Sequence, residues 1–236
     1  MLTRRHLLTT VGFSAGLMLV SPWSSPARAQ ARAQASEDQN LIDAARITVD
    51  RFAADGQFAD MRRQLAKAKG VFVVPQLLKA SFIIGGEGGS GLLLARTGTG
   101  WSEPAIYTMG AGSIGLQIGG EASEVMLLLM NDKAVDAILR NEFKLGADAT
   151  VAAGPIGMGV EAATTTHLGA DILSYSRSKG LAAGVAVEGA VITARHSRNT
   201  AYYGRQAHPR NILYDQAVSN PGTSALRQAL SMAEGR

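Results

Sequence analysis

The sequence predicts an α+β fold: a curved antiparallel β-sheet or barrel-like core with N-terminal helices, one inserted short helix and a C-terminal helix. Three observations lead to this prediction. Amphipathic helical spacing follows residue 35, short apolar runs with a period near two come next without helices between most of them, and glycine and alanine occur inside those runs. Consecutive strands without intervening helices usually pair antiparallel, and small residues allow a sheet to bend sharply.

Residues 1–35 are expected to be an export signal that precedes the fold. Arg4 and Arg5 come before an apolar run from Leu7 to Val20, and small residues with Ala-x-Ala spacing follow. The arginine pair resembles a twin-arginine address, and an ordinary secretory signal is the alternative. Several cleavage sites overlap between residues 27 and 35, so the sequence leaves the exact cut open. The protein is therefore expected in the periplasm or outside the cell.

The charge of the chain depends strongly on this signal. The whole sequence has 23 Lys and Arg against 19 Asp and Glu, and four of the arginines precede Ser36 while no acidic residue does. A chain that begins at Ser36 is thus balanced, with 19 of each. This balance argues against a general nucleic-acid-binding function, so any basic function must be local. Because the sequence contains no cysteine, the fold must hold without disulfides.

Two helical segments are expected at the start of a single domain that covers residues 36–236. Ser36 to Gln39 reads as a capping box. The apolar positions of the first helix recur at helical spacing: Leu41, Ala45, Val49 and Phe52. After Gly56 a second apolar stripe runs from Phe58 to Ala68. Four cations lie on and around the other side of that stripe: Arg62, Arg63, Lys67 and Lys69.

Strands are expected from Gly70 onward, because short apolar runs alternate there with Gly, Pro and Ser. The expected strands before the inserted helix are residues 71–74, 81–85, 91–96, 105–109, 113–119 and 124–130. Asp132 is expected to cap a short helix over residues 133–141. The later strands are expected at residues 147–154, 157–164, 171–178 and 184–195. A terminal helix is expected after Pro221.

A glycine motif in the middle of these runs raises the possibility of a nucleotide site. Gly86, Gly88 and Gly91 match G-x-G-x-x-G, which binds a dinucleotide only when a helix starts directly after it. Here Gly98, Gly100 and Pro104 would break such a helix, and no acidic residue follows at the required distance. We therefore expect residues 85–91 to connect two antiparallel strands, with the glycines serving positive φ or close backbone approach.

Residues typical of catalysis and metal binding are scattered along the chain. The histidines after the signal show no ligand spacing, and no serine lies in a G-x-S-x-G motif. The serines and histidines considered are Ser81, Ser90, Ser174, His167, His196 and His208. Glu87, Glu161 and Glu188 could supply an acid and a base, but the sequence alone does not pair them. We expect no enzyme activity, no cofactor and no metal.

Four separated motifs resemble the SYLF domain family in content and order. They are residues 67–96, 110–129, 145–157 and 174–192, followed by Tyr202-Tyr203-Gly204. The resemblance covers residues 41 to 204 and implies a non-catalytic phospholipid-binding domain. Phosphoinositides are the ligands of eukaryotic members, and actin binding is described in fungal ones. Those eukaryotic relatives carry SH3 or FYVE modules that are not visible here, so anionic phospholipid is the expected partner and actin binding is doubtful.

One segment of the sequence supports a lipid contact independently. Strand alternation would place Tyr175, Arg177 and Lys179 on one side, where two cations can meet a phosphate headgroup and the ring can lie at the interface. A solvated edge paired with Asp171 and Glu188 is the alternative. The expected lipid-binding residues are Arg62, Arg63, Lys67, Lys69, Tyr175, Arg177 and Lys179. A structural or protein-interaction domain of the cell envelope is the second function considered, and a hydrolase is the third.

Overall fold

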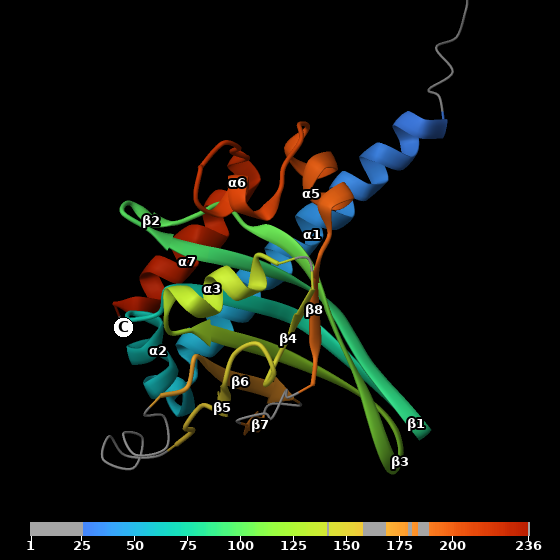
Figure 1. Cartoon of the computed structure of the whole chain (residues 1–236), viewed down its shortest axis with the longest axis vertical. Coiled ribbons are helices and arrows are strands. Elements are labelled where there is room, and N and C mark those ends of the chain that lie inside the picture. Colours follow the sequence, from blue (N-terminus) through green and yellow to red (C-terminus); the bar gives the residue numbers. More distant parts are fainter. Residues whose placement is uncertain (1–25, 141, 158–168, 179–180, 184–188, 236) are drawn as a thin grey trace, which may run out of the picture.

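The computed structural model describes residues 26–140, 142–157, 169–178, 181–183 and 189–235. Eight strands of this part form one strongly curved sheet with helices packed around it, so the expected α+β class is confirmed (Figure 1). Residues 1–25 of the expected signal, most of the strand expected over 157–164, and Lys179 lie outside the described residues.

Two very long strands form the centre of the sheet. β1 (Gly70–Thr97) and β3 (Ala105–Leu129) pair antiparallel from Gly70 opposite Leu129 to Leu93 opposite Ala105, with the two-residue β2 (Gly100–Trp101) in the turn. The sequence predicts six shorter strands over this region. The glycines and polar residues that suggest breaks lie inside continuous strands, and only two register shifts interrupt the ladder.

This two-stranded ribbon folds back on itself, as Figure 1 shows where both strands run to a tip and return. A Cβ atom on Gly89 would lie 2.3 Å from the carbonyl oxygen of Gln76, and one on Gly91 would lie 2.5 Å from the ring of Phe72. The expectation that residues 85–91 connect two strands is therefore wrong, because the segment runs inside β1. Because Gly89 and Gly91 have no side chain, two parts of β1 can approach each other closely there. This is the second of the two roles expected for these glycines.

Shorter strands complete the sheet on the free edge of β3. β6 (Ile172–Ser178) pairs with the last part of β3, and β8 (Val191–Ala194) pairs with its first part. β7 (Leu181–Ala183) pairs antiparallel with β6, and β4 (Glu142–Lys144) pairs antiparallel with β8. β5 (Val151–Ala153) lies parallel to β6, which is an exception to the expected antiparallel pairing.

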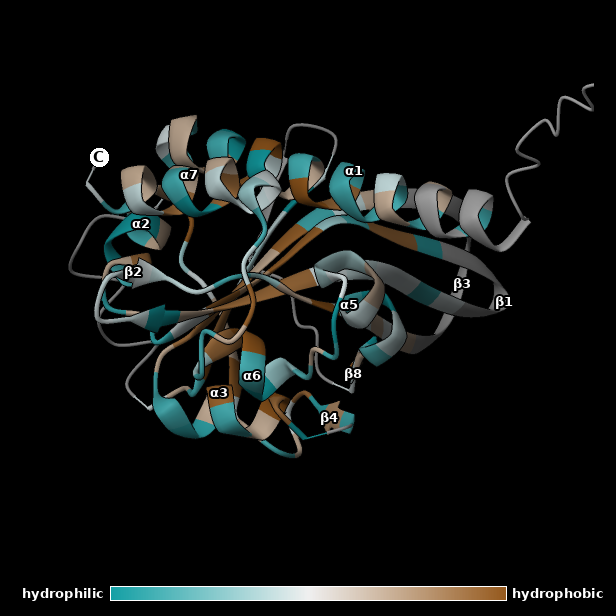
Figure 2. Ribbon diagram, turned by 90° about the horizontal axis from the view of Figure 1, so that it is seen from above, coloured by the Kyte–Doolittle hydropathy of each residue, from teal (hydrophilic) through white to brown (hydrophobic). Residues whose placement is uncertain are grey.

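Helices cover both faces of the sheet, as Figure 2 shows. α1 (Pro26–Ala54), the 3₁₀ turn η1 (Gly56–Phe58), α2 (Ala59–Leu65) and α7 (Ser224–Glu234) form one layer. α3 (Asp132–Ile138) and α6 (Pro209–Leu213) lie with β4 on the other side. α5 (His196–Tyr203) precedes α6, and the 3₁₀ turn η2 (Pro221–Thr223) precedes α7. α5 and α6 are not predicted from the sequence, and Asn131 caps α3 in place of the expected Asp132.

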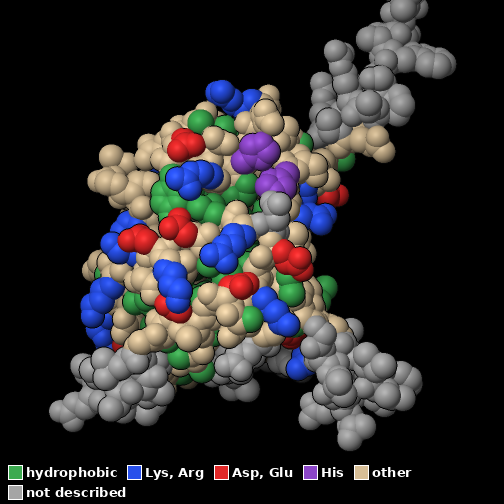
Figure 3. All heavy atoms as spheres, in the orientation of Figure 1, with side chains coloured by type: hydrophobic (Ala, Val, Ile, Leu, Met, Phe, Trp, Pro, Cys, Tyr) green, Lys and Arg blue, Asp and Glu red, His purple; other side chains and the backbone are tan. Residues whose placement is uncertain are grey.

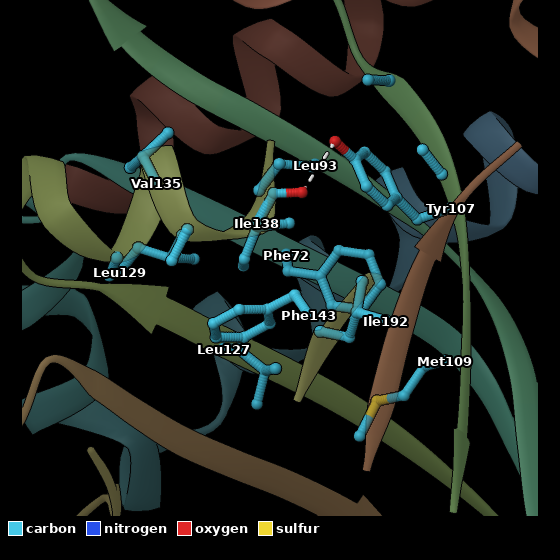
Figure 4. Close-up of a cluster of buried hydrophobic side chains, with 14 of the residues drawn as sticks. Phe72, Leu93, Tyr107, Met109, Leu127, Leu129, Val135, Ile138, Phe143 and Ile192 are labelled. Carbon is cyan, nitrogen blue, oxygen red and sulfur yellow. Dashed lines mark hydrogen bonds between the residues drawn. The ribbon is translucent and has the colours of Figure 1, made fainter. Parts of the chain in front are cut away.

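The central strands are buried on both faces, which explains their unbroken apolar runs. Val73, Leu92 and Leu94 face the layer of α1, α2 and α7. Their neighbours Phe72 and Leu93 face the opposite side, where they pack in one cluster with Ile138 and Phe143. Figure 4 shows this second cluster, in which the hydroxyl of Tyr107 donates to the carbonyl oxygen of Ile138 at 3.4 Å. Within the described residues no helix is both long and apolar enough to cross a membrane.

Candidate functional site

An open pocket of about 680 Å³ lies where α1 crosses the central ribbon beside β6. We call it the α1–β3 pocket. Its wall is formed by α1, by the first register shift of β1, by β3 and by β6. The lining residues are Ala44, Arg51, Pro75, Gln76, Ala122, Ser123, Glu124 and Arg177.

Strand register places a row of side chains along this pocket. Arg177 of β6 lies directly opposite Glu124 of β3, and Leu78 of β1 lies directly opposite Ala122. Residues 122 and 124 share a face because strand residues alternate, and cross-strand partners share that face as well. The same face carries Met126 further along β3, which packs in the helix-covered core. The row therefore faces the α1 layer.

The charges in the pocket are connected through Glu124. Its carboxylate accepts from the Arg51 guanidinium at 2.5 Å and from the Thr48 hydroxyl at 3.2 Å, while Arg177 Nη1 lies 3.5 Å away. Arg177 Nε lies 3.8 Å from a carboxylate oxygen of Asp55, and this buried nitrogen makes no hydrogen bond to the part of the chain that the structure describes. Each guanidinium has five N–H donors, so the pair retains donors that an anionic group can use.

Exposed apolar side chains flank the same pocket. Among the described residues four large apolar side chains are exposed: Ile47, Leu78, Tyr214 and Met232. Ile47 is 39% exposed and lies one helical turn from both Ala44 and Arg51 of the pocket wall. Leu78 is 53% exposed and lies opposite Ala122. The site thus combines two arginines with two apolar side chains at its rim.

Tyr175 does not lie where the sequence suggests. It shares a face of β6 with Arg177, as alternation predicts, but that face is covered by helices and the ring is fully buried. The ring packs edge-on against Phe58, and its hydroxyl donates to Asp60 at 3.1 Å. Burial raises the pKa of Tyr175 well above its usual value. The expected place of this ring at a membrane interface is therefore corrected to a place in the core.

Arg62 and Arg63 serve mainly to fasten α2 to its surroundings. Arg62 Nη1 donates to the carbonyl oxygens of Ala53 and Asp55 at 3.2 and 3.1 Å, which satisfies backbone acceptors at the end of α1. Arg63 forms an ion pair with Asp60 at 3.0 Å. The fold thereby brings Arg62 and Arg177 together around Asp55, one at its backbone oxygen and the other at its carboxylate.

Two of the three expected lysines, Lys67 and Lys69, lie apart from the pocket. Lys67 and Lys69 are exposed just before β1, at the end of the ladder where Gly70 is opposite Leu129. Arg177, in contrast, is opposite Glu124, which lies five residues before Leu129 in β3. The sequence reasoning also missed Arg51, Ile47 and Leu78. In the sequence these three residues are single charged or apolar residues on exposed helix or strand faces. Such residues are common in soluble proteins, so they did not indicate a site.

No group of three or more His, Asp or Glu side chains that could hold a metal ion converges among the described residues. Ser90 accepts from Arg198 Nη1 at 3.1 Å and not from a histidine. A second pocket, of about 560 Å³, lies between α1 and α5 beside the buried ion pair of Asp38 with Arg198. That ion pair links α1 to α5, so it has a structural role.

Comparison with known proteins adds the family relationship. The family model described as "Ysc84: Las17-binding protein actin regulator" matches residues 110–233. The chain is 35% identical over 171 residues to SH3 domain-containing protein PJ696.02 of Schizosaccharomyces pombe, covering 71% of this chain and 40% of that protein.

Two further relatives show the same extent of similarity. Protein YSC84 of Saccharomyces cerevisiae is 35% identical over 172 residues, which is 70% of this chain and 36% of that protein. SH3 domain-containing YSC84-like protein 1 of Homo sapiens is 37% identical over 153 residues, which is 64% of this chain and 44% of that protein. The chain thus spans about two fifths of the length of the curated relatives it matches.

Proposed function

Because the chain belongs to the Ysc84 (SYLF) domain family, we propose that it is a non-catalytic domain that binds the surface of membranes containing anionic phospholipid. We further propose that it does so after export, in the periplasm or outside the cell. The observation that carries the proposal is the α1–β3 pocket, where Arg51 and Arg177 line the wall. The exposed side chains of Ile47 and Leu78 are neighbours of other wall residues by helix spacing and strand register.

The chemistry of the pocket suits a phospholipid at a membrane surface. The guanidinium groups offer bidentate donors to a phosphate, and the exposed apolar side chains can enter the boundary between headgroups and acyl chains. A negatively charged surface stabilises each nearby cation by about 1 kcal/mol, but it repels the carboxylates of Glu124 and Asp55 that lie beside the two arginines, so the net electrostatic gain is small. Full burial of a fully exposed Ile or Leu side chain contributes roughly 1.5–3 kcal/mol, and Ile47 and Leu78, which are 39% and 53% exposed, can each supply a part of that amount. Two arginines alone give weak binding, so the account requires both contributions.

The names of the relatives favour a second candidate, a protein-interaction domain. LAS seventeen-binding protein 3 of Saccharomyces cerevisiae is 36% identical over 172 residues, which is 37% of that protein, and its name refers to a protein partner. The same exposed pocket could receive a side chain of such a partner. Binding to vesicles that contain no protein separates the two candidates, because only the lipid-binding function predicts it.

The test is sedimentation of the full chain with vesicles. We expect binding to vesicles that contain phosphatidylglycerol or cardiolipin, weaker binding at high salt because charges are then screened, and little binding to neutral phosphatidylcholine. Equal binding to neutral vesicles would contradict the role of the arginines. Absence of binding to all vesicles would favour the protein-interaction function.

Substitutions at the pocket rim test its role separately. We expect the double variant Ile47→Ser with Leu78→Ser to lose most of the binding to anionic vesicles. Tyr214→Ser is the matched control, because Tyr214 is also 37% exposed and directly follows α6 on the other side of the sheet (Figure 2). Equal loss in the control variant would show that the pocket rim is not the contact.

A further inference from the structure

Two histidines that are distant from the α1–β3 pocket lie in contact on the surface. His196 is the first residue of α5, and His208 directly precedes α6. Their Nδ1 atoms are 3.5 Å apart, and their ring centroids are 5.4 Å apart. Figure 3 shows the two rings side by side on an open face of the molecule. The site is thus accessible to a dissolved ion.

The distance between the two nitrogens matches a shared metal ion. Zinc binds imidazole nitrogen at 2.0–2.1 Å, so two such bonds at a tetrahedral angle place the nitrogens about 3.3 Å apart. The observed 3.5 Å needs only a small movement to reach that value. It lies at the outer limit of a hydrogen bond between two imidazoles, so the contact alone is a weak one.

The backbone on both sides of the pair is firmly held. Asn199 of α5 is buried, accepts from the backbone N–H of Ile106 at 2.7 Å and donates to its carbonyl oxygen at 3.1 Å. His208 lies between the buried residues Ala207 and Pro209, and its carbonyl oxygen accepts from Ile212 at 3.1 Å. Because neither backbone needs to move, little ordering has to accompany binding of an ion.

A third side chain can orient one of the rings. The amide nitrogen of Gln206 lies 3.1 Å from Nε2 of His208, where it donates and leaves the ring proton on Nδ1. When this exposed amide turns over, its oxygen accepts the Nε2 proton instead, and the lone pair on Nδ1 can bind a metal. Such a hydrogen bond to the outer nitrogen is typical of histidine ligands.

We propose that His196 and His208 form a two-histidine site for a divalent transition-metal ion such as Zn²⁺, through Nδ1 of both rings. Imidazole suits Zn²⁺, Ni²⁺ and Cu²⁺, and water or an external ligand completes the coordination shell. No third His, Asp or Glu forms a metal-holding group with the pair among the described residues. A bound ion would link the start of α5 to the start of α6.

The experiment is calorimetric titration of the full chain with Zn²⁺ alone. We expect one ion per chain, and we expect His196→Ala and His208→Ala each to weaken binding roughly tenfold or more, because each variant leaves a single ligand. His167→Ala is the control, since it removes a histidine elsewhere in the sequence and should leave the affinity unchanged. The melting temperature without metal checks that each variant is folded. His208 is exposed, so its variant carries the test if His196→Ala is unstable.

Thermal unfolding gives an independent measurement. Zn²⁺ should raise the melting temperature of the unmodified chain and of His167→Ala, but not that of either pair variant. The proposal is overturned if Zn²⁺ does not bind, if only one of the two pair variants weakens binding, or if His167→Ala weakens it as much as they do.

Discussion

Charged residues around the α1–β3 pocket have two different roles. Arg62 and Arg63 are held by acceptors within the fold, where they fasten α2. Arg51 donates to Glu124 at 2.5 Å while 55% of its side chain is exposed, and Arg177 lies between the carboxylates of Glu124 and Asp55. Exposed ion pairs contribute little to stability. Replacing Arg51 should therefore affect binding far more than folding.

Asp171 gives a prediction for stability at acid pH. Its pKa is lowered from 3.8 to about 2, first by the hydrogen bond from Asn131, then by those from Thr150, and further by the charge of Lys133; burial acts in the opposite direction. A carboxylate with a lowered pKa in the folded state stabilises the fold above its ordinary pKa. That contribution is present above about pH 4 and is lost as the pH falls towards 2.

We therefore expect Asp171→Asn to lower the free energy of unfolding at pH 6 by about 1–3 kcal/mol, with a smaller difference from the unmodified chain at pH 2.5. Urea unfolding at several pH values measures this difference. Asp136→Asn, at an exposed position of α3, is the control and should change stability little. A difference that does not shrink at low pH would show that the charge of Asp171 is not responsible.

At the scale of elements, the doubled ribbon of β1 and β3 depends on two glycines. Gly89 and Gly91 lie where one part of β1 faces another. A side chain at Gly89 would overlap with the backbone of Gln76, and one at Gly91 would overlap with the ring of Phe72. Gly88 lies in the same strand, yet a Cβ on it would find its nearest atom at 3.7 Å, an ordinary contact distance. The glycine cluster therefore contains both sensitive and tolerant positions.

We expect Gly89→Ala and Gly91→Ala each to destabilise the protein by about 1–3 kcal/mol, because either the backbone or the Phe72 ring must shift. Gly88→Ala should be neutral or slightly stabilising, since alanine loses less conformational freedom on folding. Urea unfolding of the three variants checks this order. Equal effects at all three positions would mean that the ribbon is not packed as closely as the contacts of Gly89 and Gly91 indicate.

The sequence predicts elements well where the signal is local. The helices at the start, in the middle and at the end follow from apolar spacing, and the curved sheet follows from strand runs rich in small residues. The expected caps are wrong, because the capping box from Ser36 lies inside α1 and Asn131 caps α3. Strand boundaries failed in β1 and β3 because glycine within a strand has the same local pattern as glycine in a turn. The pocket could not be predicted, because it depends on Glu124 meeting Arg177 across strands and on α1 lying over both.

At the scale of the whole molecule, the two central strands divide two apolar clusters. One cluster packs under α1, α2 and α7, and the other packs with α3, β4 and α6. The α1–β3 pocket opens beside the first layer, and the histidine pair lies at the junction of α5 and α6. The two proposed sites are built from different elements, so each can be removed without the other.

The expected export signal predicts that the chain is cleaved near its N-terminus when it is exported. We expect mass spectrometry of the native protein to find an N-terminus between Gln30 and Ser36, as the overlapping Ala-x-Ala sites predict. Replacing Arg4 and Arg5 by lysine should block export if the signal is of the twin-arginine type and leave it unchanged if the signal is an ordinary secretory one. Intact Met1 in a cytoplasmic fraction would contradict export.

Membrane contact through the α1–β3 pocket is the central claim, and a fluorescent label tests it most directly. Because the chain has no cysteine, single substitutions give one defined label each: Ile47→Cys, Leu78→Cys and, as the control, Tyr214→Cys. With vesicles containing phosphatidylglycerol, an environment-sensitive dye at positions 47 and 78 should shift its emission to the blue, while the dye at position 214 should not. Equal shifts at all three positions, or a shift at position 214 alone, would contradict the account.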